Sequence, residues 1–371
     1  MPGFFIAMIY IHVPFCKKFC TYCDFYSEIA GNKALLSRYA DAIVAEIKRR
    51  RREFDDPATF ITDTLYFGGG TPSLLPNEAL TRILMALEGT GHGAPYEEFT
   101  MEVNPDDIVE RGQEYLRNLR ILGVDRLSIG VQSFDDGMLR WMNRRHDAAA
   151  AEKAFRLARE AGFDNISIDL IFGLSNLSDE VWAATVEKAV ELRPEHISCY
   201  QLTVEGESAL ATLVAEGRYK EADEEQCHRQ YDILCAKLRE AGYNHYEISN
   251  FALPGYEARH NSGYWRREAY IGLGPSAHSF RGNVRYWNSN SLGGYTVSEE
   301  RLSDDAVRIE TLMLSLRTAE GIDRAWLEAH CEAKTLASLL DGGALATTEQ
   351  GRIRIPEDRF FVSDEIIREL I

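Results

Sequence analysis

Apolar runs and amphipathic stretches alternate along the chain from about residue 8 to residue 250. The short runs are rich in β-branched and aromatic residues, which is typical of buried strands, and the longer stretches place apolar residues three and four apart, as helices do. The predicted strands are 9–13, 64–67, 99–103, 126–130, 166–171 and 197–202, and the predicted helices are 78–87, 112–122, 149–161, 179–192 and 224–241. This alternation predicts an α/β fold with a parallel sheet or barrel, with functional groups at the C-terminal ends of its strands.

The pattern changes after Asn250. Residues 251–295 are rich in glycine and aromatic side chains and show little helical period, which predicts a loop-rich connector. Helical runs return at 306–316, 324–330 and 335–340, and two short strands follow at 344–347 and 353–355. Helices followed by a small hairpin predict a winged-helix-like α+β domain. We therefore divide the chain into a core at 1–250, a connector at 251–302 and a C-terminal domain at 303–371.

Composition and charge restrict the function classes. The 371 residues are 45% hydrophobic, and 41 Lys and Arg against 58 Asp and Glu give a formal charge of −17, which disfavours broad binding to nucleic acid or anionic membranes. Residues 1–13 lack the basic start of a secretory signal, and no apolar run is long enough to span a bilayer. Seven cysteines, an odd number, fit a reducing compartment. We expect a cytoplasmic protein.

Three of the cysteines form a C-x₃-C-x₂-C run, Cys16, Cys20 and Cys23, directly after the first predicted strand. Three thiolates can hold three irons of a [4Fe–4S] cluster and leave the fourth iron open to a ligand. The alternatives are unrelated thiols or a structural zinc site completed by His12 or Asp24. Zinc sites usually take a second ligand pair about 12 to 20 residues downstream, whereas the next cysteine is Cys199. The spacing therefore favours the cluster.

Further polar or glycine-rich segments follow the next strands. Three glycines, 68–70, precede Thr71 and Pro72 after the second strand, where backbone can approach a ligand closely, although flexible turns use such runs too. Glu102, Gln132 and Asp169 lie near the ends of three later strands. Asp169 interrupts an apolar strand, and a buried carboxylate without a partner is costly. Each residue alone could be a capping or turn residue, but their shared position predicts one common site.

Together these motifs resemble the radical S-adenosylmethionine (SAM) superfamily, and within it the oxygen-independent coproporphyrinogen III oxidase-like group. The resemblance covers nearly the whole chain and implies a partial (β/α)₆ barrel with a [4Fe–4S] cluster on Cys16, Cys20 and Cys23. It implies further that Tyr10 and Tyr22 line the SAM site, that Gly69, Gly70 and Thr71 hold the methionine amino end, and that Glu102, Gln132, Arg144 and Asp169 complete it. Arg144 would suit the carboxylate and Asp169 the ribose hydroxyls, but Arg145 is adjacent to Arg144.

In two departures from the oxidase the chain resembles the HemW-type haem chaperones: it lacks one cysteine, and its segment before Cys16 is shorter. The oxidase carries a further cysteine where this sequence has Phe25, which argues against oxidase activity. The chaperones carry a His-Asn-x-x-Tyr-Trp motif, found here as His260, Asn261, Tyr264 and Trp265. These four residues are haem-binding candidates, since an imidazole can ligate iron and aromatic rings suit a flat macrocycle. The residues alone, without the resemblance, favour a connector loop that packs its aromatic side chains on the barrel.

The resemblance implies a haem chaperone that uses a [4Fe–4S] cluster and SAM and carries haem as cargo. Its partners would be apo-haemoproteins of respiratory chains as acceptors and bacterioferritin as a donor, with peripheral contact to membrane-bound acceptors but no nucleic acid. We also consider a homodimer. The alternatives are a coproporphyrinogen III oxidase, another radical SAM enzyme acting on a tetrapyrrole, or a zinc-stabilised interaction protein.

Overall fold

A curved sheet of parallel strands forms the centre of the protein. The structure is a computed structural model that describes residues 6–54, 63–206, 208–292 and 296–371. The six predicted strands are confirmed and lie side by side, parallel and in chain order: β1 (Ile6–Val13), β4 (Thr64–Gly69), β5 (Glu98–Val103), β6 (Arg126–Gln132), β7 (Ile166–Phe172) and β8 (His196–Gln201). Because parallel strands in chain order need a crossover between each pair, the helices must cover the outside of the sheet.

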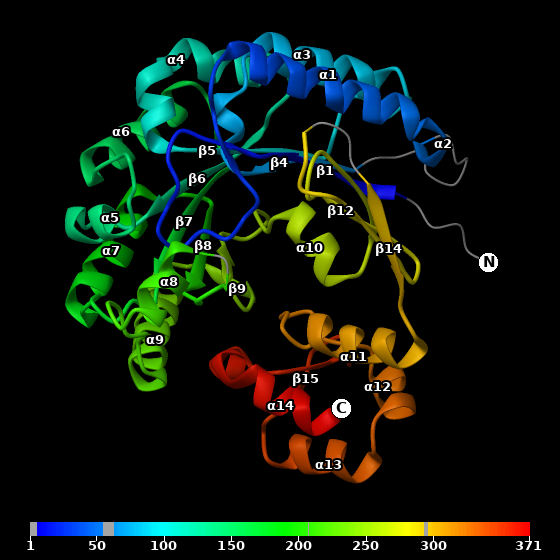
Figure 1. Ribbon diagram of the computed structural model, residues 1–371. Coiled ribbons are helices and arrows are strands. Elements are labelled where there is room, and N and C mark those ends of the chain that lie inside the picture. Colours follow the sequence, from blue (N-terminus) through cyan, green and yellow to red (C-terminus); the bar gives the residue numbers. More distant parts are fainter. Residues whose placement is uncertain (1–5, 55–62, 207, 293–295) are drawn as a thin grey trace.

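The crossover helices do cover the outer face of the sheet (Figure 1). They are α1 (Lys33–Arg49) with the short α2 (Arg51–Phe54), α3 (Asn77–Glu88), α4 (Pro105–Ile121), α5 (Asp136–Trp141), α6 (Ala148–Glu160), α7 (Asp179–Leu192), α8 (Ala209–Ala215) and α9 (Glu224–Glu240). Each long helix buries one apolar stripe, as α6 does with Ala151, Ala154, Phe155 and Ala158. The predicted helices are thus confirmed, and the one predicted at 112–122 is the second part of α4, which is kinked at Gly112, where φ is +68°.

The segment after residue 250 differs from the predicted loop-rich connector. It contains β10 (Asn250–Ala252), the helix α10 (Arg259–Trp265) and the strands β11 (Ala269–Leu273), β12 (His278–Arg281), β13 (Val284–Asn288) and β14 (Val297–Arg301). β11 pairs in parallel with β1, and β12 to β14 continue the sheet antiparallel, while β10 and β9 (Asn244–Glu247) extend its other end beyond β8. The strands are only three to five residues long, too short for local periodicity to indicate them.

The C-terminal segment forms a separate layer of helices on the side of the molecule away from α1 and α3 (Figure 1). The predicted helices and hairpin are confirmed as α11 (Asp304–Ser315), α12 (Arg324–His330), α13 (Ala333–Asp341) and the antiparallel pair β15 (Ala346–Thr347) and β16 (Ile353–Arg354). A 3₁₀ turn (Glu357–Val362) and α14 (Ser363–Leu370) follow. Leu312, Leu327 and Phe360 are fully buried in this layer. The three-domain division at residues 250 and 302 stays a proposal.

Candidate cofactor site

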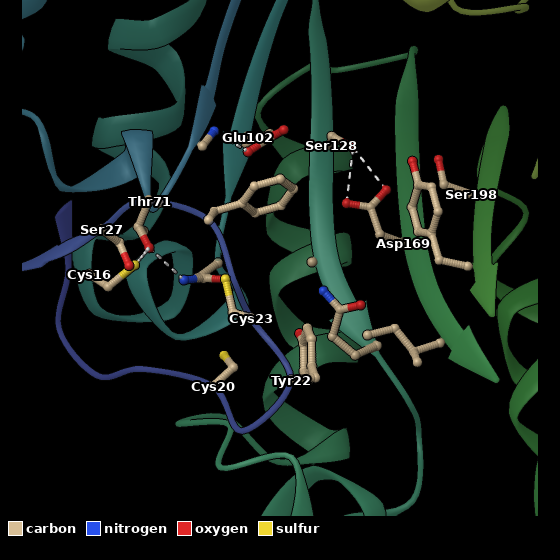
Figure 2. Close-up of a pocket in the computed structure, with 18 of the residues that line it drawn as sticks. Cys16, Cys20, Tyr22, Cys23, Ser27, Thr71, Glu102, Ser128, Asp169 and Ser198 are labelled. Carbon is tan, nitrogen blue, oxygen red and sulfur yellow. Dashed lines mark hydrogen bonds between the residues drawn. The ribbon is translucent and has the colours of Figure 1, made fainter. Parts of the chain in front are cut away.

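A cavity of about 620 Å³ opens at the C-terminal ends of the parallel strands. Its lining residues come from the loop after β1 and from the ends of β4, β5, β6, β7 and β8. Figure 2 shows the three cysteines on one side of this space and the polar side chains of β6, β7 and β8 on the other. The cavity is therefore where the predicted site residues meet. Among them, Cys16, Cys20, Tyr22, Cys23, Gly69, Gly70, Thr71, Glu102, Gln132, Arg144 and Asp169 line it.

The cysteine loop is held by hydrogen bonds at its base and at its tip. Two-residue strands β2 (Phe15–Cys16) and β3 (Glu28–Ile29) pair with each other and close the base of the loop. At its tip the amide of Thr21 donates to the carbonyl of Met142 (3.1 Å), and the side chain of Asn143 donates to the carbonyl of Phe19 (2.7 Å). The loop is thus fixed against the end of α5, and its three sulfur atoms face one space.

The glycine run passes so close to β1 that side chains would not fit. A Cβ atom on Gly70 would lie 2.9 Å from the backbone of Val13 and of Phe15, and one on Gly69 would lie 2.5 Å from the ring of His12. The Gly70 amide donates to the Val13 carbonyl at 2.9 Å, and Gly69 has a φ of +105°, which favours glycine. The run therefore brings the end of β4 directly against the base of the cysteine loop.

A chain of hydrogen bonds links two of the cysteines. The guanidinium of Arg144 donates to Cys20 Sγ (3.3 Å), to the side-chain oxygen of Asn104 (2.7 Å) and to the Gly130 carbonyl (2.6 Å). Asn104 donates to the Thr71 hydroxyl (3.1 Å), which in turn donates to Cys16 Sγ at 3.6 Å (Figure 2). Arg145 points elsewhere and pairs with Asp106 and Asp107. The structure thus places Arg144, and not Arg145, at the cavity.

Two carboxyl groups face the cavity with different partners. Glu102 accepts from the Tyr66 hydroxyl (2.8 Å) and from the Gly69 amide (3.0 Å), and burial raises its pKa to about 7. Asp169 accepts from the Ser128 hydroxyl at 2.9 and 3.1 Å, and burial raises its pKa as well (Figure 2). Both groups keep lone pairs that a ligand's hydroxyl or ammonium group can use.

Several cavity residues were missed by the sequence analysis. They are Tyr66, Arg126, Ser128, Ser198 and Tyr200, which all line the same space. Arg126 is 1% exposed, and its Nε atom has no hydrogen-bond partner within the described part of the chain. Arg126 and Ser128 alternate with the buried Leu127 and Ile129 along β6. That period-two pattern, polar on the inner face and apolar on the outer face, was the available signal.

The His-Asn-x-x-Tyr-Trp segment forms α10, which lies on the inner side of the sheet against β1 and β4 (Figure 1). Its residues point in different directions. Asn261 lines the cofactor cavity, whereas Trp265 lines a separate pocket of about 390 Å³ beside the C-terminal layer. His260 is 1% exposed, and its Nδ1 and Nε2 atoms lie 2.8 and 3.0 Å from the hydroxyl oxygens of Thr64 and Tyr264. Both ring nitrogens thus have protein partners.

Tyr10 differs from its expected position. Its ring lies 6.0 Å from that of Tyr66, and its hydroxyl is bonded to His12 at 3.0 Å. It is absent from the described residues that line the cavity. Tyr10 therefore supports the wall of the site from behind Tyr66 and Gly68, since a Cβ atom on Gly68 would approach its ring at 3.0 Å. A direct contact between Tyr10 and a cofactor stays a prediction.

Comparisons with known proteins agree with this geometry. The sequence model of the Radical SAM superfamily matches residues 10–189. The protein named "Heme chaperone HemW" from Mycobacterium tuberculosis is 34% identical over 98% of this chain and 94% of its own length. The chain belongs to the HemW family. The HemW protein of Bacillus subtilis is 36% identical over 77% of this chain and 74% of its own length.

The fold of this chain is similar to that of a solved structure. The coproporphyrinogen III oxidase HemN of Escherichia coli, described as a radical SAM enzyme, superposes with a TM-score of 0.81 and covers all of this chain and 90% of its own, at 24% identity. The predicted α/β barrel fold is therefore confirmed. Membership of the radical SAM superfamily implies a [4Fe–4S] cluster and SAM as cofactors.

Proposed function

We propose that this HemW-family protein is a haem chaperone that binds haem and delivers it to apo-haemoproteins, on a core that holds a [4Fe–4S] cluster and SAM. The observation that carries the proposal is the similarity to proteins named haem chaperones over nearly the whole chain, including the C-terminal layer. The cavity supports it, because all three cysteines and the polar strand ends line one space.

The cysteine residues fit a cluster with one open iron. Three sulfur ligands face the cavity, and sulfur is the preferred ligand of iron–sulfur clusters. Within the described ranges no three His, Cys, Asp or Glu side chains converge closely enough for a single metal ion. Burial raises the pKa of Cys16, and raises that of Cys23 to about 11, so both free thiols are neutral near pH 7. Binding iron would release their protons.

The remaining cavity residues fit SAM. We assign Gly69, Gly70 and Thr71 to its amino end, Arg144 to its carboxylate and Asp169 to its ribose hydroxyls. Glu102, Gln132 and Tyr22 would complete the contacts. A guanidinium already fixed by Asn104 and Gly130 can receive a carboxylate without losing further side-chain entropy. When bound, a reduced cluster and SAM supply one-electron reductive chemistry.

The proposed partners are apo-haemoproteins of respiratory chains as acceptors and bacterioferritin as a donor. No helix among the described residues is long and apolar enough to cross a membrane. The formal charge of −17 suits contact with basic protein surfaces better than with anionic lipid. We propose a cytoplasmic protein that meets membrane-bound acceptors at their exposed faces.

We propose haem contacts for four residues of α10: His260, Asn261, Tyr264 and Trp265. In the structure described here they are not yet arranged to bind haem. His260 can ligate iron only if Thr64 or Tyr264 releases one of its ring nitrogens. Trp265 and Asn261 line two different pockets, so these two candidates do not face one common site in this structure.

The test is an anaerobic haem-transfer assay. Reconstituted protein should contain about four irons and four sulfides per chain, bind haem with a shifted Soret band, and pass that haem to an apo-respiratory subunit. The variant with all three cysteines changed to alanine should lose iron and sulfide. If haem-loaded protein transfers no haem, the chaperone proposal is wrong. If reduced protein with SAM removes two carboxyl groups from coproporphyrinogen III, as detected by mass spectrometry, the oxidase alternative is correct.

A further inference from the structure

Two phenyl rings are exposed on the cysteine loop at the mouth of the cofactor cavity. Phe19 and Phe25 are 48% and 65% exposed, and both line the cavity, so they lie where it opens. Tyr200 and Leu202, from the end of β8 and the loop after it, line the same cavity from the opposite wall. We call Phe19, Phe25, Tyr200 and Leu202 the apolar rim.

The exposure of the rim is built into the fold. The hydrogen bonds of Thr21 and Asn143 fix the loop on both sides of Cys20, so Phe19 is not exposed by a loose chain end. Exposed aromatic side chains that gather at one opening are typical of a surface that binds an apolar partner. Flat rings stack on aromatic side chains with about 0.5–1.5 kcal/mol per pair beyond simple burial.

The charged residues near the apolar rim suit a largely apolar ligand that carries few anionic groups. Lys18, next to Phe19 in the chain, also lines the cavity, and it forms no hydrogen bond or ion pair within the described residues. Its neighbour Lys17, in contrast, is paired with Asp107 and Glu110. Asp24 and Glu205 also reach the cavity, so a strongly anionic ligand would be repelled. Most of the binding free energy must therefore come from the apolar rings.

We infer that the apolar rim binds the flat face of the tetrapyrrole, with Lys18 available to one carboxylate edge, and that this contact needs no iron ligand from α10. The inference rests on the proposed function and deepens it, because it places the cargo beside the cofactor cavity. The alternative site on α10 offers a histidine whose two ring nitrogens are already bonded and a tyrosine whose hydroxyl is bonded to that histidine.

Iron-free protoporphyrin IX separates the two sites, because ring stacking does not depend on iron whereas ligation by His260 does. Wild-type reconstituted protein should bind haem and protoporphyrin IX with dissociation constants within about threefold of each other, measured by tryptophan fluorescence quenching. The double variant Phe19→Ala with Phe25→Ala should weaken both at least about tenfold, as the loss of two stacking contacts predicts. The Phe19→Tyr with Phe25→Tyr variant keeps both flat rings and should bind both ligands like wild type.

Matched controls keep the inference falsifiable. Ile121 and Met85 are 81% and 64% exposed on other helices, so their double alanine variant should bind both ligands like wild type. Iron content and SAM affinity are measured for every variant, and the tyrosine pair is decisive if the alanine pair loses its cluster. Unchanged affinity in the alanine pair with an intact cluster would overturn the inference, as would wild-type protein that binds haem but not protoporphyrin IX. Absence of haem binding by wild type would instead overturn the proposed function itself.

Discussion

The Nδ1 atom of His260 lies 2.8 Å from the hydroxyl oxygen of Thr64, which joins α10 to the first residue of β4. The ring also stacks on Tyr66 with centroids 5.0 Å apart. We expect His260→Gln to lower the free energy of unfolding by about 1–3 kcal/mol at pH 7.5, because buried hydroxyl groups lose their partner. Urea unfolding measures the change. Equal stability of variant and wild type would show that these bonds are not formed.

The same residue predicts a pH dependence of stability. Burial lowers the pKa of His260 to about 3, whereas an unfolded histidine titrates near 6.5. Between these values the unfolded chain binds a proton that the folded chain does not, so stability falls as pH falls below about 6.5. From pH 6.5 to 5.5 the His260 contribution should fall by about 1 kcal/mol. His260→Gln should therefore show a flatter decline than wild type in urea unfolding, and an identical slope would contradict this.

The core strands and crossover helices could be predicted from the sequence because their apolar patterns are local. Each core strand is an apolar run, and each crossover helix carries an apolar stripe. α10 could not be predicted in this way, since only His260 and Gly263 are buried in it. Its first turn depends on Glu98, which accepts from the amides of Arg259 and His260 at 2.8 and 3.0 Å. A helix fixed by a carboxylate some 160 positions away leaves no periodic pattern.

The candidate site also has a part that the sequence indicates locally and a part that depends on the fold. The cysteine run and the glycine run could be identified because each is contiguous. The choice of Arg144 rested on the family resemblance, since the side chains of two adjacent cations differ only in direction. Asn104 and the Gly130 carbonyl attract one guanidinium, and Asp106 with Asp107 attracts the other. Such a choice needs the positions of groups that fold against the pair.

Arg144 and Arg145 provide a matched test of the SAM assignment. In Arg144→Lys one ammonium replaces a planar group that contacts Asn104, Gly130 and Cys20 together, and it cannot receive a carboxylate in two places. We expect the dissociation constant for SAM to rise about tenfold, as measured by equilibrium dialysis on reconstituted protein. Arg145→Lys should change it less than about twofold. Similar effects in both variants would exclude a specific role for Arg144.

The buried carboxyl group of Glu102 should lower the stability of the SAM-free protein when it ionises. Its pKa of about 7 in the folded protein exceeds the ordinary value of about 4.5, so its contribution to stability is complete below pH 4.5 and is lost as pH rises through 7. Glu102→Gln keeps an oxygen for Tyr66 and Gly69 but never ionises. Without SAM, the variant should exceed wild type in unfolding free energy by about 1–2 kcal/mol at pH 8, and by less at pH 6. Urea unfolding at both pH values tests this, and a variant that is less stable at pH 8 would contradict it.

Gly70 tests how the glycine run positions the cysteine loop. In Gly70→Ala the new Cβ atom would lie 2.9 Å from the backbone of Val13 and Phe15, so the base of the loop must shift. We expect the unfolding free energy to fall by about 1–3 kcal/mol and the iron content after anaerobic reconstitution to decrease. Gly89→Ala is the control, because the nearest atom to its Cβ, at the end of α3, is 3.4 Å away and its φ of −64° suits alanine. If Gly70→Ala retained full iron content and SAM affinity, close approach of these two backbones would not be required for the site.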